Sequence, residues 1–536
     1  MADKRLLLNG NEAVAYAALD SGVQLGAGYP GTPSTEILET FSALGGHAQW
    51  SPNEKVATEV GMGAAFGGAW ALVAMKHVGL NVAADPLFTA AYAGVQGALV
   101  IVVADDPGLS SSQNEQDSRR YAIAAGVPMI EPADAQQSYD FLSQAFAISA
   151  RWQIPVLFRT TTRVCHSKSI VRRRELPRPA SAPHFERKIL ERVMVPANAR
   201  PAHRRLRAKL EEIRKWAEEP GHGTILFRPL NGKSPERHIL ANGISVMHAR
   251  EAAPDAAVLQ VVMVHPAPVD AFRSFLADGE CQVIEEGDPV IVEICRMAGV
   301  QVQDKPAIYR FGEFSVTRVR RLLAGARSPA APPPPGRPPQ LCVGCPHRVA
   351  FEVFKAADAI VSGDIGCYTL GYLPPFEAMD SQTCMGASIG TGLGLRHVLP
   401  EAEARRVISV IGDSTFLHSG LTGIAEMVYN PPPTGHVVVI LDNGTTAMTG
   451  LQEHPASGRR LDHTPATRIA IEDVCRALGV PNVRVIDHTQ NRDAFAALLR
   501  EALQSGQLWV IVARKPCILS AVKIRQLEKG PMNERD

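Results

Sequence analysis

Short apolar runs alternate with longer segments of mixed polarity along most of this chain. Near its end, the runs 407–411 and 437–441 are rich in Val and Ile, which is typical of buried strands in a parallel sheet. Segment 419–429 lies between them and predicts the crossover helix that two parallel strands require. Similar runs at 99–103 and 156–158, separated by helical stretches of small residues, predict a second sheet of the same kind.

This alternation predicts an α/β fold built from several doubly wound domains. The domain boundaries follow changes in composition, notably a charged helix expected over Pro201 to Glu219 as a solvated linker and a run of prolines at 332–335. In the middle domain we expect strands at 257–264 and 282–286. We expect a first domain over 1–170, a linker with the charged helix over 171–221, a second domain over 222–327, a Pro-rich linker over 328–339, a third domain over 340–520 and a polar tail over 521–536.

The overall composition excludes several classes of protein. The 55 Lys and Arg residues balance 54 Asp and Glu residues, so no net charge draws the chain to nucleic acid or to an anionic membrane. No apolar run approaches the roughly 18 residues of a membrane span, and the first residues lead into a predicted strand instead of a signal peptide. We therefore expect a cytoplasmic protein, and its nine cysteines argue against a disulfide framework.

The predicted strands at 407–411 and 437–441 each end in polar residues. Gly412, Asp413 and Ser414 follow the first strand, and Asn443 follows the second. Because parallel strands share a carboxyl edge, a glycine turn, a carboxylate and a carboxamide should meet there. Asp413 and Asn443 offer hard oxygen ligands to Mg²⁺, and Thr445 is placed to add its backbone carbonyl. The pattern predicts a site for a magnesium-bound diphosphate, similar to the signature of thiamine diphosphate enzymes; the alternative is an ordinary Asx turn.

A glycine-rich stretch, 385–394, precedes this site. It begins with Met385 and Gly386 and has three more glycines, at positions 390, 392 and 394. Small residues can serve close helix packing, or they can let the backbone approach a cofactor; both interpretations remain open.

Glu59 is the one charge in a run of small and apolar residues, 59–69, near the start of a predicted helix. A buried carboxylate of this kind has a raised pKa and can share a proton with the pyrimidine ring of thiamine. The alternative is a carboxylate that faces the positive end of the helix dipole.

Four cysteines form a second set of candidate ligands. Cys342 and Cys345 have the C-x2-C spacing, Cys367 follows a tight glycine turn and Cys517 follows the last predicted strand. From the spacing, the pair can bind either zinc or two corners of an iron–sulfur cluster. For four other cysteines we expect ordinary buried thiols: Cys165, Cys281, Cys295 and Cys475.

Several longer motifs are spread along the chain, and the resemblance that they carry covers about residues 5–520. They lie at 28–34, 53–59, 104–108, 342–348, 363–371, 384–388, 412–420 and 441–450. With these motifs the chain resembles the 2-oxoacid:ferredoxin oxidoreductases, and within them the alpha subunits of indolepyruvate:ferredoxin oxidoreductase. The resemblance implies three doubly wound domains of the thiamine-enzyme type, as in pyruvate:ferredoxin oxidoreductase: a pyrimidine-binding domain, a transketolase-C-like domain and a diphosphate-binding domain.

The resemblance also implies roles for particular residues. Family members bind thiamine between the first and last domains, often across a dimer interface. Glu59 falls at the position of the pyrimidine-activating glutamate, and Thr32 falls where the family has a threonine near the substrate. The four cysteines Cys342, Cys345, Cys367 and Cys517 match positions that hold a [4Fe–4S] cluster in related pyruvate enzymes, and Cys517 is the fourth ligand in that match.

One departure from the family concerns electron transfer. Typical indolepyruvate enzymes carry a ferredoxin-like tail with two dense cysteine runs, and this sequence has none after Cys517. The resemblance therefore implies a separate electron-transfer partner, either a ferredoxin or another iron–sulfur or flavin subunit. It also implies a separate small beta subunit of the gamma type, in a hetero-oligomer that contains a dimer of this chain.

The expected reaction is the oxidative decarboxylation of a 2-oxoacid to its acyl-CoA. Pyruvate enzymes have an arginine where this chain has Asp105-Asp106-Pro107, and an asparagine near the position of Met448. The apolar thioether favours a bulkier, aryl substrate such as indolepyruvate. His418 is a candidate proton donor, although a lone histidine is more often structural.

Three alternatives stay open at this point. The chain can be a non-redox thiamine-dependent decarboxylase, the catalytic core of a phenylglyoxylate or other 2-oxoacid oxidoreductase complex, or a scaffold subunit without catalysis.

Overall fold

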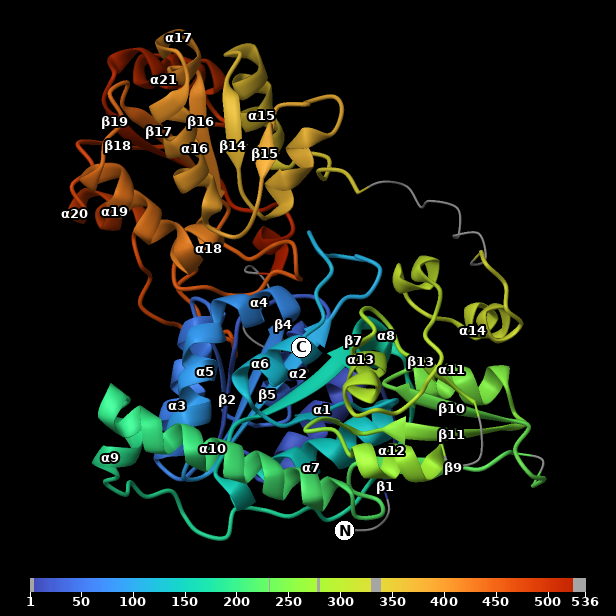
Figure 1. The fold of residues 1–536 in the computed structure, drawn as a ribbon. Helices are drawn as coiled ribbons and strands as arrows, with labels where there is room; N and C mark the ends of the chain where they lie inside the picture. The colour runs from blue at the N-terminus through green and yellow to red at the C-terminus, as the bar shows by residue number, and fades with distance from the viewer. Residues whose placement is uncertain (1–3, 231, 277–279, 329–338, 524–536) are drawn as a thin grey trace, which may run out of the picture. The chain divides into compact units, whose positions relative to one another are not determined.

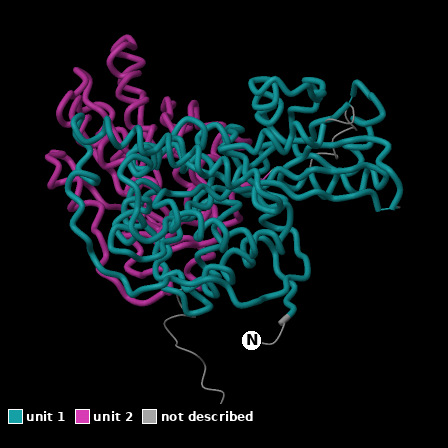
Figure 2. Tube along the Cα trace, turned by 60° about the horizontal axis from the view of Figure 1, so that its bottom comes forward, with its two compact units in different colours: residues 1–333 teal, residues 334–536 magenta. Residues whose placement is uncertain are grey.

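The computed structural model describes residues 4–230, 232–276, 280–328 and 339–523. The chain forms two compact units, residues 1–333 (unit 1) and 334–536 (unit 2) (Figure 2). The predicted first and second domains thus share one unit, and the predicted third domain forms the other. Residues 329–338 of the predicted Pro-rich linker (328–339) and residues 524–536 of the predicted tail (521–536) fall outside the described residues.

A seven-stranded sheet forms the centre of unit 1 (Figure 1). All neighbouring strands are parallel except the first pair, β12 and β6. Every position of β4, β5 and β7 is buried, which confirms the strands predicted at 99–103 and 156–158. In sheet order the strands are β12 (Met263–His265), β6 (Met129–Ile130), β7 (Val156–Thr161), β5 (Ala98–Asp105), β4 (Trp70–Lys76), β2 (Leu25–Gly28) and β3 (Ala48–Trp50).

Helices follow most of these strands, as in a doubly wound fold. A short antiparallel pair, β1 (Lys4–Leu8) and β8 (Ser169–Arg173), lies outside the large sheet. The helices are α1 (Gly10–Asp20), α2 (Thr35–Ala43), α3 (Glu54–Phe66), α4 (His77–Val82), α5 (Ala84–Ala93), α6 (Arg119–Ala125), α7 (Ala135–Trp152) and α8 (Thr162–His166).

A four-stranded sheet forms the second part of unit 1. The strand predicted at 257–264 is two strands in two sheets: β11 stays in the small sheet, and β12 pairs with β6 of the large one. A continuous apolar run cannot reveal this change of sheet, because both partners bury it equally well. In sheet order the strands are β13 (Cys281–Ile284), β10 (Arg237–Asn242), β11 (Ala256–Val261) and β9 (Thr224–Phe227). The helices are α11 (Ser245–Ala252), α12 (Val269–Phe275), α13 (Val290–Met297), η1 (Ala307–Arg310) and α14 (Val316–Leu323).

The charged linker helix differs from its prediction. After the short α9 (Ile189–Arg192), helix α10 spans Pro196–Ala217, so it begins before Pro201. The prediction of a solvated helix is wrong for one face, which packs against α5. The buried residues are three or four positions apart, as a single helical stripe requires: Ala202, Leu206, Leu210, Ile213 and Ala217.

Unit 2 contains a six-stranded, fully parallel sheet. The strands at 407–411 and 437–441 are neighbours, as predicted, and the predicted crossover helix is α19 after one π-helical turn, η3. In sheet order the strands are β15 (Ser381–Gln382), β14 (Ile360–Gly363), β16 (Val407–Gly412), β17 (His436–Asp442), β19 (Leu508–Arg514) and β18 (Asn482–Ile486). The helices are α15 (Pro346–Ala356), η2 (Cys367–Tyr372), α16 (Ala387–Val398), α17 (Glu401–Ala404), α18 (Asp413–Thr415), η3 (Phe416–Gly420), α19 (Leu421–Tyr429), α20 (Ile471–Ala477) and α21 (Arg492–Ser505).

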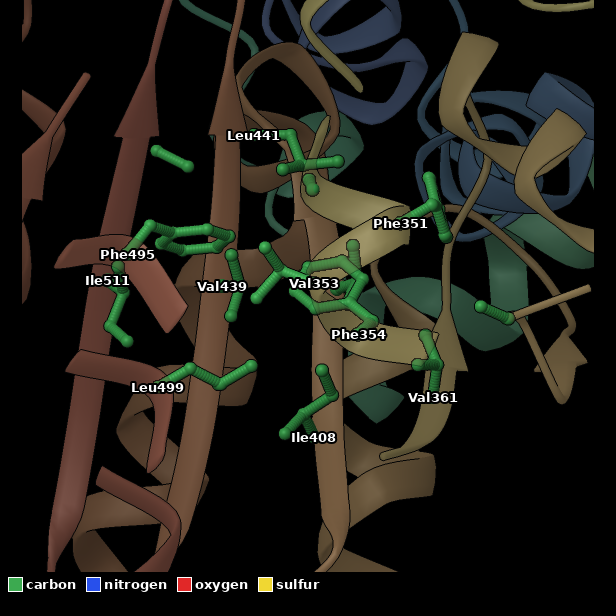
Figure 3. Close-up of a cluster of buried hydrophobic side chains, with 14 of the residues drawn as sticks. Phe351, Val353, Phe354, Val361, Ile408, Val439, Leu441, Phe495, Leu499 and Ile511 are labelled. Atoms are coloured by element: carbon green, nitrogen blue, oxygen red, sulfur yellow. The ribbon is translucent and has the colours of Figure 1, made fainter. Parts of the chain in front are cut away.

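Both faces of this sheet are covered. Alternate residues of β17 point to opposite faces, so Val439 and Leu441 pack with Phe351 of α15 and Phe495 of α21 (Figure 3). On the other face, Val438 and Ile440 belong to a cluster with residues of α16 and α19. Each fully buried Val, Leu, Ile or Phe contributes roughly 1.5–3 kcal/mol. The two clusters therefore hold β16 and β17 in fixed register, and with them the loops at their carboxyl ends.

Candidate functional site

The carboxyl ends of β16 and β17 bring the two predicted ligand motifs together. Gly412 pairs with Leu441, Asp413 begins α18, and Asn443 follows β17 directly. The backbone amide of Gly444 donates a hydrogen bond to Asp413 Oδ2 at 2.7 Å. The parallel pairing inferred from the sequence thus places both motifs on one edge.

Asp413 is a buried carboxylate. Burial by itself raises its pKa, but the nearby His454 and the hydrogen bonds from the amides of Ser414 (2.9 Å) and Gly444 outweigh burial and bring the pKa below its usual value. The carboxylate is therefore ionised at neutral pH, as a ligand of a hard cation must be.

His454 is a site residue that the sequence analysis missed. Its Nε2 lies 3.2 Å from Asp413 Oδ2, and its Nδ1 accepts a hydrogen bond from the amide of Ala456 at 3.3 Å. Because Nδ1 is an acceptor, Nε2 carries the proton that faces the carboxylate. The loop after β17 returns His454 to Asp413 through tertiary structure, and no spacing in the sequence marks this contact.

Asn443 and Thr445 are both buried in the loop after β17. Asn443 Oδ1 accepts the Thr445 amide at 3.0 Å, and the Thr445 hydroxyl donates to the carbonyl of Gln452 at 3.2 Å. The Asn443 Nδ2 lies 3.4 Å from Nε2 of His347, a second residue that the sequence analysis missed. Burial lowers the pKa of His347 to about 4, so the imidazole is neutral and can accept this contact.

The glycines of this region have packing roles that the structure makes visible. Gly386 has φ of 86°, and a Cβ there would lie 2.5 Å from the Cβ of Ser419. A Cβ on Gly412 would lie 2.7 Å from a ring carbon of Tyr368. The interpretation of small residues for close packing within the chain is therefore confirmed at Gly386; the closeness of a cofactor stays a prediction, as does a cofactor contact of the half-buried Met385.

Two hydroxyl groups lie beside these glycines. The Ser414 hydroxyl is 2.8 Å from that of Thr446, which joins the two motif loops once more. His418 is buried in the π-helical turn, and its Nδ1 lies 2.5 Å from the Ser419 hydroxyl. This contact is consistent with a structural histidine, and its role in proton transfer stays a prediction.

The four candidate cluster cysteines line one pocket of unit 2, together with His347 and Asn443. Burial raises the pKa of Cys345 to about 11 and that of Cys367 to about 12, and in each case the charges of the other cysteines of the group add to the shift. The Cys517 amide donates to the carbonyl of Asn443 at 2.9 Å, which ties the fourth cysteine to the loop after β17. The remaining predicted thiols, Cys165, Cys281, Cys295 and Cys475, are buried as expected.

Within the described part of the chain, no group of three or more His, Cys, Asp or Glu side chains is arranged closely enough to hold a metal ion. The ligand sets for Mg²⁺ and for an iron–sulfur cluster therefore stay predictions.

In unit 1 the structure corrects one expectation. Helix α3 begins after Asn53, whose side chain caps the amide of Val56 at 2.9 Å. Glu59, predicted to be buried on this helix, has a side chain that is 43% exposed within the chain and forms an ion pair with Lys55. Five residues earlier, at the start of the helix, Glu54 is the buried carboxylate. Glu59 stays at the surface of unit 1 because the small residues around it are too short to cover its side chain.

Thr32, the second candidate in unit 1, lies in the loop after β2 and is half-buried. Its carbonyl accepts a hydrogen bond from the Ser111 hydroxyl at 3.4 Å. The loop after β5 therefore reaches the loop after β2 at the carboxyl edge of the large sheet.

The search for membrane-spanning segments, over the residues that the structure describes, finds no helix long and apolar enough to cross a bilayer.

Comparison with known proteins defines the class first. Residues 16–205 match the model of the thiamine diphosphate-binding domain of pyruvate flavodoxin/ferredoxin oxidoreductase, and residues 364–513 match the C-terminal thiamine pyrophosphate-binding domain of thiamine pyrophosphate enzymes. A solved structure, the 2-oxoglutarate:ferredoxin oxidoreductase from Magnetococcus marinus, shares the fold with a TM-score of 0.51 at 15% identity, over 61% of this chain and 66% of that one. The fold and both matches are those of a thiamine diphosphate-dependent 2-oxoacid oxidoreductase.

More similar relatives define the family. The indolepyruvate oxidoreductase subunit IorA of Archaeoglobus fulgidus is 37% identical over 98% of this chain and 88% of its own length. The protein of the same name from Methanothermobacter thermautotrophicus is 39% identical over 97% of this chain and 88% of its own length. The chain belongs to the indolepyruvate oxidoreductase subunit IorA family.

Proposed function

We propose that this chain is the thiamine-binding subunit of an enzyme that oxidatively decarboxylates an aryl 2-oxoacid, such as indolepyruvate, to its acyl-CoA. The bond between the carboxyl and keto carbons breaks and CO₂ leaves. A bond forms between the keto carbon and the sulfur of coenzyme A as the thiol proton is released, and two electrons pass to an acceptor protein. Family membership supports this reaction and disfavours the non-redox decarboxylase and the scaffold.

One observation carries the proposal: the ionised Asp413 and the Asn443 loop meet at the carboxyl edge of the unit 2 sheet. Asp413, Asn443 Oδ1 and the Thr445 carbonyl would provide an all-oxygen donor set, which fits Mg²⁺. Gly412, Ser414 and Gly386 would leave room for the diphosphate beside them. Thiamine diphosphate, when bound, supplies the electron sink for loss of CO₂.

Glu59 is the proposed acid that exchanges a proton with the pyrimidine ring. Its exposure within unit 1 means that its desolvation must come from surfaces outside that unit, and the cofactor or a second subunit would provide them. Thr32 is the proposed neighbour of the substrate, and His418 of unit 2 remains a candidate proton relay.

Cys342, Cys345, Cys367 and Cys517 are the proposed ligands of a [4Fe–4S] cluster. The support is chemical: all four cysteines line one pocket, where burial raises the pKa of the Cys345 and Cys367 thiols in the absence of metal. Iron binding would relieve this penalty because it stabilises the thiolates. Electrons would leave through this cluster to a ferredoxin or another electron-transfer subunit.

The assembly and the substrate follow from the same proposal. The relatives are named as subunits of an oxidoreductase, and we propose a dimer of this chain that associates with a separate small beta subunit. Met448, in the loop after Asn443, is 50% exposed within the chain and would offer its thioether to an aryl side chain.

The proposal is tested on the anaerobically purified complex, co-expressed with its beta subunit. We expect viologen reduction that requires coenzyme A and is faster with indolepyruvate or phenylpyruvate than with pyruvate. We also expect a broad absorbance near 400 nm, typical of an iron–sulfur cluster, which is lost in Cys345→Ser and kept in Cys475→Ser, a control at a buried thiol outside the pocket. A complex that binds thiamine diphosphate but produces aldehyde without reducing the dye contradicts the oxidoreductase.

A further inference from the structure

A buried lysine lies at the carboxyl edge of the large sheet in unit 1. Lys76 is the last residue of β4, whose neighbours in the sheet are β2 and β5. Only 8% of the residue is exposed, whereas lysines are rarely buried to this extent without a partner of opposite charge. A buried lysine at the end of a central strand therefore indicates a functional role.

The contacts of Lys76 connect it to the Thr32 loop. Its ammonium donates to the carbonyl of Ser111 at 2.7 Å and lies 3.4 Å from the Ser111 hydroxyl. The same hydroxyl lies 3.4 Å from both the carbonyl of Thr32 and Asp106 Oδ2. On the other side, a Cβ on Gly31 would lie 3.0 Å from Lys76 Cβ, so the loop after β2 rests directly against the lysine stem. Lys76, Ser111 and Thr32 thus form one group at the sheet edge.

The charge of Lys76 is not balanced in the way other buried cations of this unit are. Arg119 pairs with Asp117 at 2.5 Å and also with Glu285, and Arg159 pairs with Asp105 at 2.7 Å and also with Glu131. Among the described residues, Lys76 forms no ion pair within 4.0 Å.

The carboxylate whose charge acts on Lys76 is that of Asp106, and it already accepts hydrogen bonds from hydroxyl groups. Its carboxylate accepts hydrogen bonds from Ser112 at 2.5 Å and from Thr162 at 2.9 Å. Burial lowers the pKa of Lys76, and the charge of Asp106 opposes only part of that shift. A carboxylate that entered this group would form a direct ion pair with the ammonium, and such a charge-assisted hydrogen bond is stronger than one to a neutral carbonyl.

We propose that Lys76 is the cation that binds the carboxylate of the 2-oxoacid substrate, beside Thr32. This inference rests on the proposed function and adds to it the residue that distinguishes an acid from an uncharged analogue. Arg119 and Arg159 do not qualify, because each is already paired with two carboxylates in the interior of unit 1.

The test compares two inhibitors that differ only in charge: 3-phenylpropanoate and 3-phenylpropanamide. Each is measured as a competitor of phenylpyruvate in the holoenzyme complex. Wild-type enzyme should bind the acid more tightly than the amide. In Lys76→Gln that preference should fall by roughly 10- to 150-fold, the range expected for loss of a hydrogen bond to a charged group, and the KM for phenylpyruvate should rise by a similar factor.

Lys209→Gln is the matched control. Lys209 is another lysine of unit 1 whose pKa burial lowers and whose ammonium donates to a backbone carbonyl, that of Gln153 at 3.0 Å, but it lies on α10. This variant should keep the acid-over-amide preference. If Lys76→Gln keeps the preference as well, while it binds thiamine diphosphate normally, Lys76 does not bind the carboxylate.

A measurement on the unmodified protein covers the case in which the Lys76 variant does not fold. Acetic anhydride labelling of wild-type enzyme, read by mass spectrometry, should acetylate Lys76 more slowly when 3-phenylpropanoate is present, whereas the amide and the Lys209 signal should show no such effect. Equal protection by acid and amide overturns the inference. Failure of the proposed function is a different result: the wild-type complex then turns over no aryl 2-oxoacid.

Discussion

The two units present their candidate acids in opposite ways. In unit 2, Asp413 is buried, ionised and held by two amides and His454 before any ligand arrives. In unit 1, Glu59 stands on a helix of small residues, largely exposed and paired with Lys55. The first acid is preorganised by its own unit, as a metal ligand should be. The second acid needs a surface from outside unit 1 to remove water from it. With the proposed role of Glu59, burial within one unit is therefore not a requirement for a catalytic carboxylate.

The largest effect on cofactor binding is expected in unit 2, where the residues around Asp413 are already in place within the unit. Asp413→Asn removes the charge that Mg²⁺ requires and should weaken magnesium-dependent binding of thiamine diphosphate by more than about 100-fold, since even indirect changes around metal ligands cost 10- to 100-fold. Calorimetry with and without Mg²⁺ measures this. Asp358→Asn, at an exposed carboxylate of the same unit, should bind as wild type does. Unchanged affinity in Asp413→Asn contradicts the metal site.

Glu59→Gln tests the proposed role of the exposed acid in unit 1. Thiamine diphosphate should still bind, because Glu59 makes no contact with the metal in our proposal, but kcat should fall by about 10²- to 10⁴-fold, as for loss of a general acid–base residue. Steady-state turnover and calorimetry together check this. Lys55→Gln removes the ion-pair partner and leaves the acid, so it should stay near wild-type activity. An equal fall in kcat in Glu59→Gln and Lys55→Gln would mean that turnover depends on the ion pair and not on the acid.

His454→Gln sharpens the description of Asp413. Loss of the imidazole beside the carboxylate should weaken Mg²⁺ binding by about 10- to 100-fold, the range typical of residues that orient a metal ligand. Titration of Mg²⁺ at saturating thiamine diphosphate measures it. His397→Gln, on the exposed end of α16, is the control. If both variants bind Mg²⁺ as wild type does, His454 does not orient Asp413.

The smallest effect on activity is expected for substitution of Glu286, a residue of unit 1 that is distant in sequence from Glu59 and Asp413. Burial raises its pKa to about 7, and its carboxyl accepts the amide of Phe314 at 2.7 Å. The folded state thus keeps a proton that the unfolded chain loses above about pH 4.5, so stability from this group is full below that pH and is lost as pH rises through about 7.

Glu286→Gln keeps the acceptor oxygen and removes the titration. Denaturant unfolding at pH 5 and pH 8 should show that wild type loses more stability than the variant over this interval, by about 1.4 kcal/mol for each unit of pKa shift. Parallel losses in the two proteins would show that Glu286 does not titrate in this range.

Much of unit 2 could be predicted from the sequence because its signals are local. The runs at 407–411 and 437–441 identify two buried strands, and parallel pairing then fixes which residues share an edge. Asp413 and Asn443 follow from that pairing without any knowledge of the rest of the fold. The cysteines could be listed but not brought together, since Cys517 returns to the others only through the pairing of β19 with β17 and the amide contact to Asn443.

In unit 1 several predictions from local sequence were wrong, because contacts between distant segments decided the structure. The run at 257–264 divides between two sheets, α10 buries one face of a helix expected to be solvated, and Glu59 is exposed where its neighbours suggested burial. Lys76 and His454 drew no attention in the sequence, because each gains its surroundings from loops far along the chain.

The sequence by itself determined the class of fold, the strand edge that carries Asp413 and Asn443, and the family to which the motifs point. These depend on hydrophobic periodicity and on short spacings, which act between neighbours in the chain. The tertiary structure alone decided which acids are buried, which histidine faces Asp413 and which loops surround the buried Lys76. Burial and charge pairing are sums over all segments that pack at one place, and no single stretch of sequence contains that sum.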